Sequence, residues 1–96
     1  MATPIKARDI VKNINKYKGD IIGVTIRGAG SQWVRLVDAR MKGVWVELTV
    51  KMCTHNAHMG IRTKKLAPEI TVNHQRLESW LRWCAMYGIE TNHEFE

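Results

Sequence analysis

The sequence predicts a single α+β domain with an N-terminal helix, an antiparallel meander of three to four strands and a C-terminal helix. Three observations support this class: a helical apolar period near the start, apolar–polar alternation in the middle and a second helical period near the end. The chain has 96 residues and 45% of them are hydrophobic, which suits one domain over residues 1–96. The acidic segment 90–96 is expected to fray.

The N-terminal helix is predicted to start at Thr3 and Pro4. A threonine is a good N-cap, and proline suits the first helical position because its missing N–H is not needed there. Gly19 ends the helix. The apolar face predicted for it consists of Ala7, Ile10, Val11, Ile14 and Tyr17. On the opposite face, cations recur every fourth residue and form a stripe of Arg8, Lys12 and Lys16.

Three alternating runs predict the meander. Their apolar residues are Ile22, Val24 and Ile26, then Val34 and Leu36, then Val44, Val46, Leu48 and Val50. Turns are expected at residues 28–31 and 39–43. Pairing Asp38 with Val44 would place Leu36 opposite Val46, Val34 opposite Leu48, and Arg35 opposite Glu47.

The segment from Lys51 to Thr71 is less regular. A short fourth strand is expected around Ile61, with Pro68 ending it. Asn73 then suits the N-cap of the last helix, which Gly88 closes. Its apolar stripe comprises Leu77, Trp80, Leu81, Cys84 and Tyr87.

The formal net charge is +6 and the pI is about 9.7, which favours acidic partners such as nucleic acid or an acidic protein surface. Cys53 and Cys84 are too few for a disulfide scaffold and are expected to be reduced thiols. No run approaches the roughly 18 apolar residues of a membrane helix. The start also lacks the apolar stretch of a signal peptide, so a cytoplasmic location without a membrane partner is predicted.

Cys53, His55 and His58 are candidate zinc ligands, with Cys84 or His74 as a further ligand. The segment has no CxxC pair and needs a ligand from a distant helix, so a polar loop is favoured and no cofactor is predicted. The acids Asp38, Glu47, Glu69 and Glu78 are scattered, and the glycines at 28 and 30 lack the rest of a phosphate-binding loop. The protein is therefore predicted not to be an enzyme.

The outward face of the sheet offers aromatic residues interleaved with cations. Alternation places Arg27, Trp33, Arg35, Trp45 and Lys51 there, a pattern that resembles a stacking platform for single-stranded nucleic acid. The alternative is that a helix covers this face, so that both tryptophans belong to the core.

One edge of the last helix carries residue types that often dominate protein interfaces. The residues are Arg76, Trp80, Trp83 and Tyr87. The predicted protein interface also includes the basic loop formed by Arg62, Lys64, Lys65 and Pro68. Such cations are often merely solvated, but on one side of the domain they would steer it to an acidic partner.

Three segments resemble the small anti-RecBCD proteins of the Abc type carried by lambdoid phages. They are Ile5-Lys6-Ala7-Arg8-Asp9-Ile10-Val11, Lys64-Lys65-Leu66-Ala67-Pro68-Glu69, and the Trp-rich helix from Leu77 to Tyr87. The resemblance covers the whole chain. It implies a phage accessory protein that binds a host DNA-repair nuclease-helicase such as RecBCD and changes its activity, which protects phage DNA ends. A single-stranded nucleic-acid-binding module is the alternative.

Overall fold

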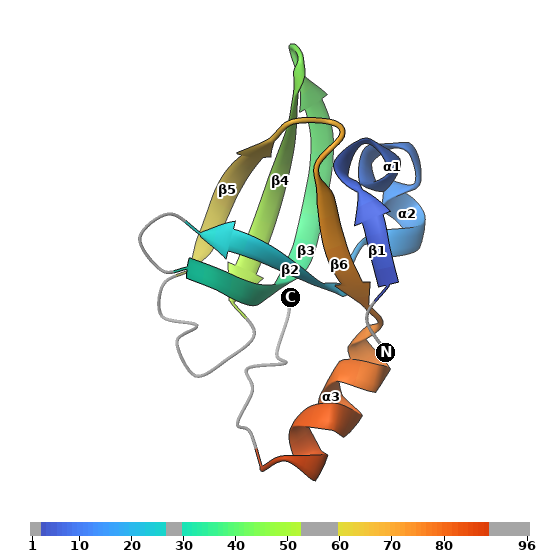
Figure 1. Ribbon diagram of the computed structural model, residues 1–96, viewed down its shortest axis with the longest axis vertical. Helices are drawn as coiled ribbons and strands as arrows, with labels where there is room; N and C mark the ends of the chain where they lie inside the picture. The colour runs from blue at the N-terminus through green and yellow to red at the C-terminus, as the bar shows by residue number, and fades with distance from the viewer. Residues whose placement is uncertain (1–2, 27–29, 53–59, 89–96) are drawn as a thin grey trace.

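The computed structural model describes residues 3–26, 30–52 and 60–88 (Figure 1). Three helices accompany a six-stranded sheet, which confirms the α+β class with more strands than predicted. In chain order the elements are β1 (Thr3–Lys6), α1 (Ala7–Lys12), α2 (Ile14–Tyr17), β2 (Ile21–Ile26), β3 (Gly30–Lys42), β4 (Trp45–Met52), β5 (Ile61–Leu66), β6 (Thr71–Gln75) and α3 (Leu77–Met86).

The sheet has the strand order β1-β6-β2-β3-β4-β5, and every neighbouring pair is antiparallel. The central part, from β2 to β5, is the predicted meander extended by a fourth strand. The expected strand around Ile61 is therefore confirmed as β5. β6 lies between β1 and β2, so strands from the two ends of the chain are neighbours (Figure 1).

The prediction of a helix from Thr3 is wrong, because Thr3–Lys6 form β1. This strand pairs with β6 from Thr3 opposite His74 to Lys6 opposite Thr71. Pro4 is tolerated because β1 is an edge strand, where one side of the backbone needs no partner. The helical segment begins at Ala7, and Asn13 divides it into α1 and α2. Gly19 follows with φ +93°, as expected of a residue that ends a helix.

The hairpin between β3 and β4 has a tighter turn and another register than predicted. Lys42 pairs with Trp45, leaving only Gly43 and Val44 in the turn. Gly43 has φ +64°, which a two-residue turn of type II′ requires at its first position. β3 thus runs through the predicted turn, and Arg40, not Arg35, lies opposite Glu47.

A bulge in β3 completes the change of register. The pairing shifts between Leu36 and Asp38, so Val37 is the extra residue. The Asp38 carboxylate accepts a hydrogen bond from the backbone N–H of Ala39 at 2.9 Å. Leu36 also bonds through its backbone to Gly19 and Asp20, so β3 contacts the end of the α2 segment. β3 pairs with β2 before the bulge and with β4 on both sides of it.

The main core lies between the inner face of the sheet and the helices α1 and α2. Ala7 and Ile10 of α1 are fully buried against inward residues of β2, β3 and β4. The strand residues of this core are Ile22, Val24, Val34, Leu36, Ala39, Val46, Leu48, Val50 and Val72. Each buried aliphatic side chain contributes roughly 1.5–3 kcal/mol, so this cluster dominates the stability.

The last helix starts later than predicted, and Asn73 is not its N-cap. Asn73 lies within β6, and α3 runs from Leu77 to Met86 with Arg76 at the N-cap position. Gly88 has φ +68° and closes the helix as expected. α3 packs on the outer face through a separate small cluster of Ile21, Trp80, Cys84, Trp33, Leu77 and Leu81. Figure 1 shows it leading away from the sheet beyond the end of β6.

Candidate functional site

A continuous series of aromatic rings runs from the sheet along α3. The rings of Trp33 and Trp80 are 5.3 Å apart between centroids, and those of Trp80 and Trp83 are 5.2 Å apart with planes at 19°. Tyr87 continues the series 4.9 Å from Trp83. The spacing of three and four residues along the helix places these side chains on one face. We call Trp33, Trp80, Trp83 and Tyr87 the aromatic series.

Glycine at position 23 explains how the series is anchored. Gly23 lies opposite Trp33 in the ladder, and a Cβ there would be 3.5 Å from the indole ring. The ring therefore lies over β2 at contact distance. Trp33 also lines an open hollow of about 390 Å³ together with Thr71 and Asn73.

Exposure of the rings increases along α3 from Trp80 to Tyr87. Trp80 is 4% exposed, whereas Trp83 is 39% and Tyr87 is 64% exposed. Met86, one turn from Trp83, is 71% exposed. We call Trp83, Met86 and Tyr87 the aromatic edge. Tyr87 was expected in the apolar stripe facing the domain, but the helix ends before it and its ring faces solvent.

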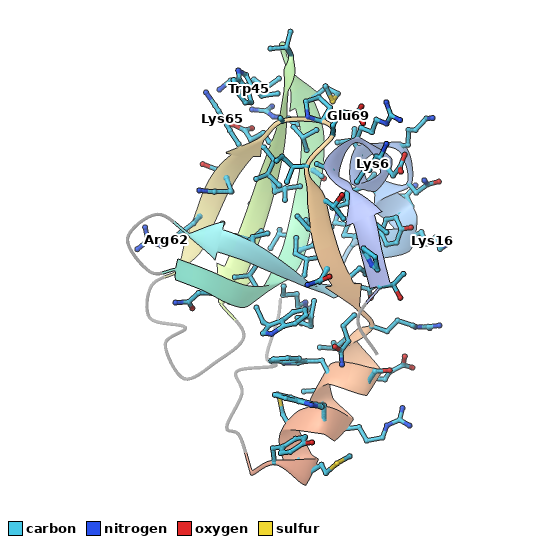
Figure 2. The ribbon with its side chains drawn as sticks, in the orientation of Figure 1. Lys6, Lys16, Trp45, Arg62, Lys65 and Glu69 are labelled. Atoms are coloured by element: carbon cyan, nitrogen blue, oxygen red, sulfur yellow. The ribbon has the colours of Figure 1, made fainter. Side chains whose placement is uncertain are left out.

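The structure does not bring together all residues of the predicted protein interface. Trp80 is buried, while Trp83 and Tyr87 are available and Arg76 forms an exposed ion pair of 3.4 Å with Glu78. Arg62, Lys64 and Lys65 of the predicted basic loop lie in the strand β5. Lys65 lies at the opposite end of the molecule from α3 (Figure 2). Pro68 lies in the turn after β5 and accepts a backbone hydrogen bond from Arg8. Arg62, Lys64, Lys65 and Pro68 therefore do not extend the aromatic edge.

The proposed stacking platform is also divided. α3 covers Trp33, which confirms the alternative for that residue, whereas Trp45 is 47% exposed. Trp45 pairs with Lys42, which is nine residues along β3 from Trp33, a separation of about 30 Å in an extended strand. The two tryptophans cannot stack neighbouring bases. Arg35 and Lys51 lie opposite each other on β3 and β4, between the positions of Trp33 and Trp45. Arg27 is outside the described residues.

Trp45 lies instead beside a charged network on the outer face of β3 and β4. Arg40 donates through Nε to the Glu47 carboxylate at 2.7 Å, and Lys42 Nζ is 3.7 Å from its other oxygen. Glu47 is only 9% exposed. The hydrogen bond from Arg40 and the positive charges of Arg40 and Lys42 lower the pKa of Glu47, although burial opposes the shift.

This shift gives a pH prediction. Because the pKa of Glu47 is lowered, its carboxylate stabilises the fold above its ordinary pKa of 4.5 and loses that contribution as the pH falls through the lowered value. We expect Glu47→Gln to be less stable than the wild type at neutral pH, and the difference to shrink below about pH 4. Urea unfolding of the wild type and the variant at neutral pH and below about pH 4 measures the difference in their free energies of unfolding. Glu78→Gln, at an exposed pair, is the control, and a difference independent of pH would contradict the prediction.

The predicted basic stripe of the first helix is also modified. Arg8 and Lys6 both bind Glu69, at 2.6 Å and 3.0 Å, so they attach β1 and α1 to the turn before β6. The hydrogen bond from Lys6 and the charge of Arg8 lower the pKa of Glu69. Lys16 lies on α2, with its ammonium 5.6 Å from the centroid of the Tyr17 ring. Arg8 therefore carries a paired charge, although its side chain remains 51% exposed.

The metal-site residues Cys53, His55 and His58 lie outside the described residues. In the part of the chain that is described, no group of three or more His, Cys, Asp and Glu side chains is placed to hold a metal ion. Cys84 is buried in the α3 cluster, where burial raises the pKa of its thiol. It is a small apolar core residue, as the sequence suggested.

A histidine–aspartate pair was missed by the sequence reasoning. His74 Nε2 lies 2.6 Å from an Asp20 oxygen, and the Tyr17 ring contacts the imidazole edge-on. They line a hollow of about 190 Å³ with Lys16 and Arg76. These lining residues include no Ser, Thr or Cys nucleophile, so we interpret the pair as a link between the end of α2 and β6. The pairing of β6 with β2 brings these residues, distant in sequence, close together.

No protein-family model, curated protein or solved structure matches the chain. Within the described segments, no helix has the length and apolar character needed to cross a membrane.

Proposed function

We propose that this protein is a non-catalytic binding protein that attaches to a protein partner through the aromatic edge of α3. The supporting observation is the exposure of Trp83, Met86 and Tyr87 together at the end of a helix that projects from the sheet (Figure 1). Large exposed apolar side chains that cluster mark interaction sites, and Trp and Tyr are prominent among hot-spot residues. Methionine adds an adaptable apolar contact.

The packing of α3 supports this role. Trp80 holds the helix against Trp33 and Ile21, so the next ring in the series, Trp83, is already fixed by stacking before a partner arrives. A preorganised side chain loses little entropy on binding. Trp83 nevertheless remains 39% exposed between Trp80 and Tyr87.

The resemblance to anti-RecBCD proteins of the Abc type makes a bacterial nuclease-helicase the first partner to test. In this proposal the protein acts in the cytoplasm of the host cell, where it modulates the enzyme and favours phage recombination. A specific interface needs about 800 Å² from each partner, so the aromatic edge would be its centre and neighbouring polar residues its rim.

The test uses purified RecBCD immobilised on a biosensor, with the wild-type protein in solution, and a parallel assay of exonuclease activity on linear duplex DNA. We expect saturable binding and a change in nuclease activity over the same concentration range. Absence of both would refute the nuclease-helicase as partner. Binding that Trp83→Ala does not weaken would refute the aromatic edge as the contact.

A further inference from the structure

The outer face of β3, β4 and β5 carries a second surface, far from α3. Lys42 pairs with Trp45, and on the next outward row Arg40, Glu47 and Lys65 lie side by side on the three strands. Outward rows along a strand are about 7 Å apart. We call Arg40, Lys42, Trp45 and Lys65 the basic face. Figure 2 shows Trp45 and Lys65 together at the end of the sheet opposite α3.

We propose that the basic face binds single-stranded nucleic acid, with phosphates on its cations and an unpaired base against Trp45. This is a different activity from protein docking and uses residues that the aromatic edge does not share.

The charge of the face suits a polyanion. Its buried acid, Glu47, lies beneath Arg40 and Lys42, whose side chains remain 66% and 55% exposed although both are paired with it. Glu47 thus fixes the two cations without covering them, and Lys65 adds another exposed positive charge. The acid on the following row, Asp38, is engaged by the backbone of the bulge. Arg35 and Lys51 continue the cationic path on the row beyond.

The strand β5 extends this charge to the edge of the sheet. β5 pairs only with β4 in the described sheet, and Arg62 and Lys64 lie on its inner side while Lys65 lies on its outer side. Lysines on an edge strand discourage pairing with another sheet. Here Lys65 also adds positive charge to the outer face at this edge, which favours phosphates over a neutral peptide.

Trp45 determines the class of polyanion. It is 47% exposed beside Lys42, an arrangement that suits stacking of one base while the cation holds its phosphate. Bases of a duplex are already stacked and paired, and an acidic peptide or lipid headgroup does not carry a flat ring next to each negative charge as a nucleotide does. An exposed indole among cations therefore favours a single strand over these other anions.

The experiment measures fluorescence anisotropy of a labelled oligothymidine of about 20 nucleotides at low salt, a length that exceeds a typical site. We expect binding that weakens steeply with salt, and a loss of at least about tenfold in Lys42→Glu/Lys65→Glu. The matched control is Lys12→Glu/Lys18→Glu, an equal change of charge at exposed positions in and after the helices. It should lose less than about threefold. Circular dichroism confirms that the variants are folded.

Trp45→Ala should weaken binding of the single strand about tenfold and leave weak binding to a duplex of equal length unchanged. Trp83→Ala should leave oligonucleotide binding intact, so failure here is distinguishable from failure of protein docking. The proposal is overturned if the wild type does not bind, if both double variants lose affinity equally, or if Trp45→Ala has no effect. Equal affinity for duplex and single strand would likewise overturn it.

Discussion

Replacing Trp80 with alanine is expected to release α3 from the sheet at a cost of about 3–5 kcal/mol. Trp80 is 4% exposed and lies between Trp33 and Trp83, so its removal empties the centre of the small α3 cluster. The main core contains no α3 residue. Amide hydrogen exchange should therefore show α3 losing protection at lower denaturant concentration than β4, because the two rest on separate clusters.

Trp80→Phe provides the control for this prediction. The indole Nε1 of Trp80 is buried and has no hydrogen-bond partner among the described residues. Phenylalanine keeps an aromatic ring and removes this unpaired donor, whose burial costs roughly 1–3 kcal/mol. We expect it to lose much less stability than Trp80→Ala. Equal protection of α3 in wild type and Trp80→Ala would show that the aromatic series does not hold the helix.

Replacing Trp83 with alanine is expected to weaken attachment to the protein partner by at least about 2 kcal/mol, or roughly 30-fold in Kd. The ring is the first member of the series that reaches solvent, and it is held by stacking on Trp80. Stability should change little, since Trp83 is not part of either core cluster. Titration of purified RecBCD with the variant measures the loss.

Trp45→Ala is the matched control because Trp45 is also a partly exposed tryptophan, at the other end of the molecule. It should change protein binding less than about threefold, as expected for a residue outside an interface. Similar losses in both variants would indicate that the contact is not localised to α3.

The sequence predicted elements whose signals are local. Apolar alternation identified β2, β3 and β4, and Gly19 and Gly88 marked helix ends correctly. β1 and β6 were missed because their stability comes from pairing across the whole chain. Thr3 and Asn73 are good N-caps by type, and β6 has only Val72 as an apolar residue, so no alternation was available. Tertiary pairing overrode the local preference in both segments.

The candidate surfaces were predicted in part for the same reason. The helical spacing of Trp80, Trp83 and Tyr87 was sufficient to place them on one edge, and in the structure the rings lie 5.2 Å and 4.9 Å apart. The distribution of charge depended on register. The two-residue turn at Gly43 places Glu47 opposite Arg40 instead of Arg35, which builds the network beside Trp45, and the bulge at Val37 shifts the register beyond Asp38. The bulge at Val37 leaves no clear signal in a single sequence. The turn does have one, because Gly43 suits the first position of a type II′ turn.

Site-specific photo-crosslinking tests the central claim, attachment through α3, most directly. A photoreactive residue is placed at Met86, on the aromatic edge, and separately at Met41, an exposed methionine near the far end of β3. Each folded variant is irradiated with purified RecBCD. The proposal predicts a covalent adduct from position 86 and none from position 41. An adduct from position 41 alone, or equal adducts from both, would contradict it.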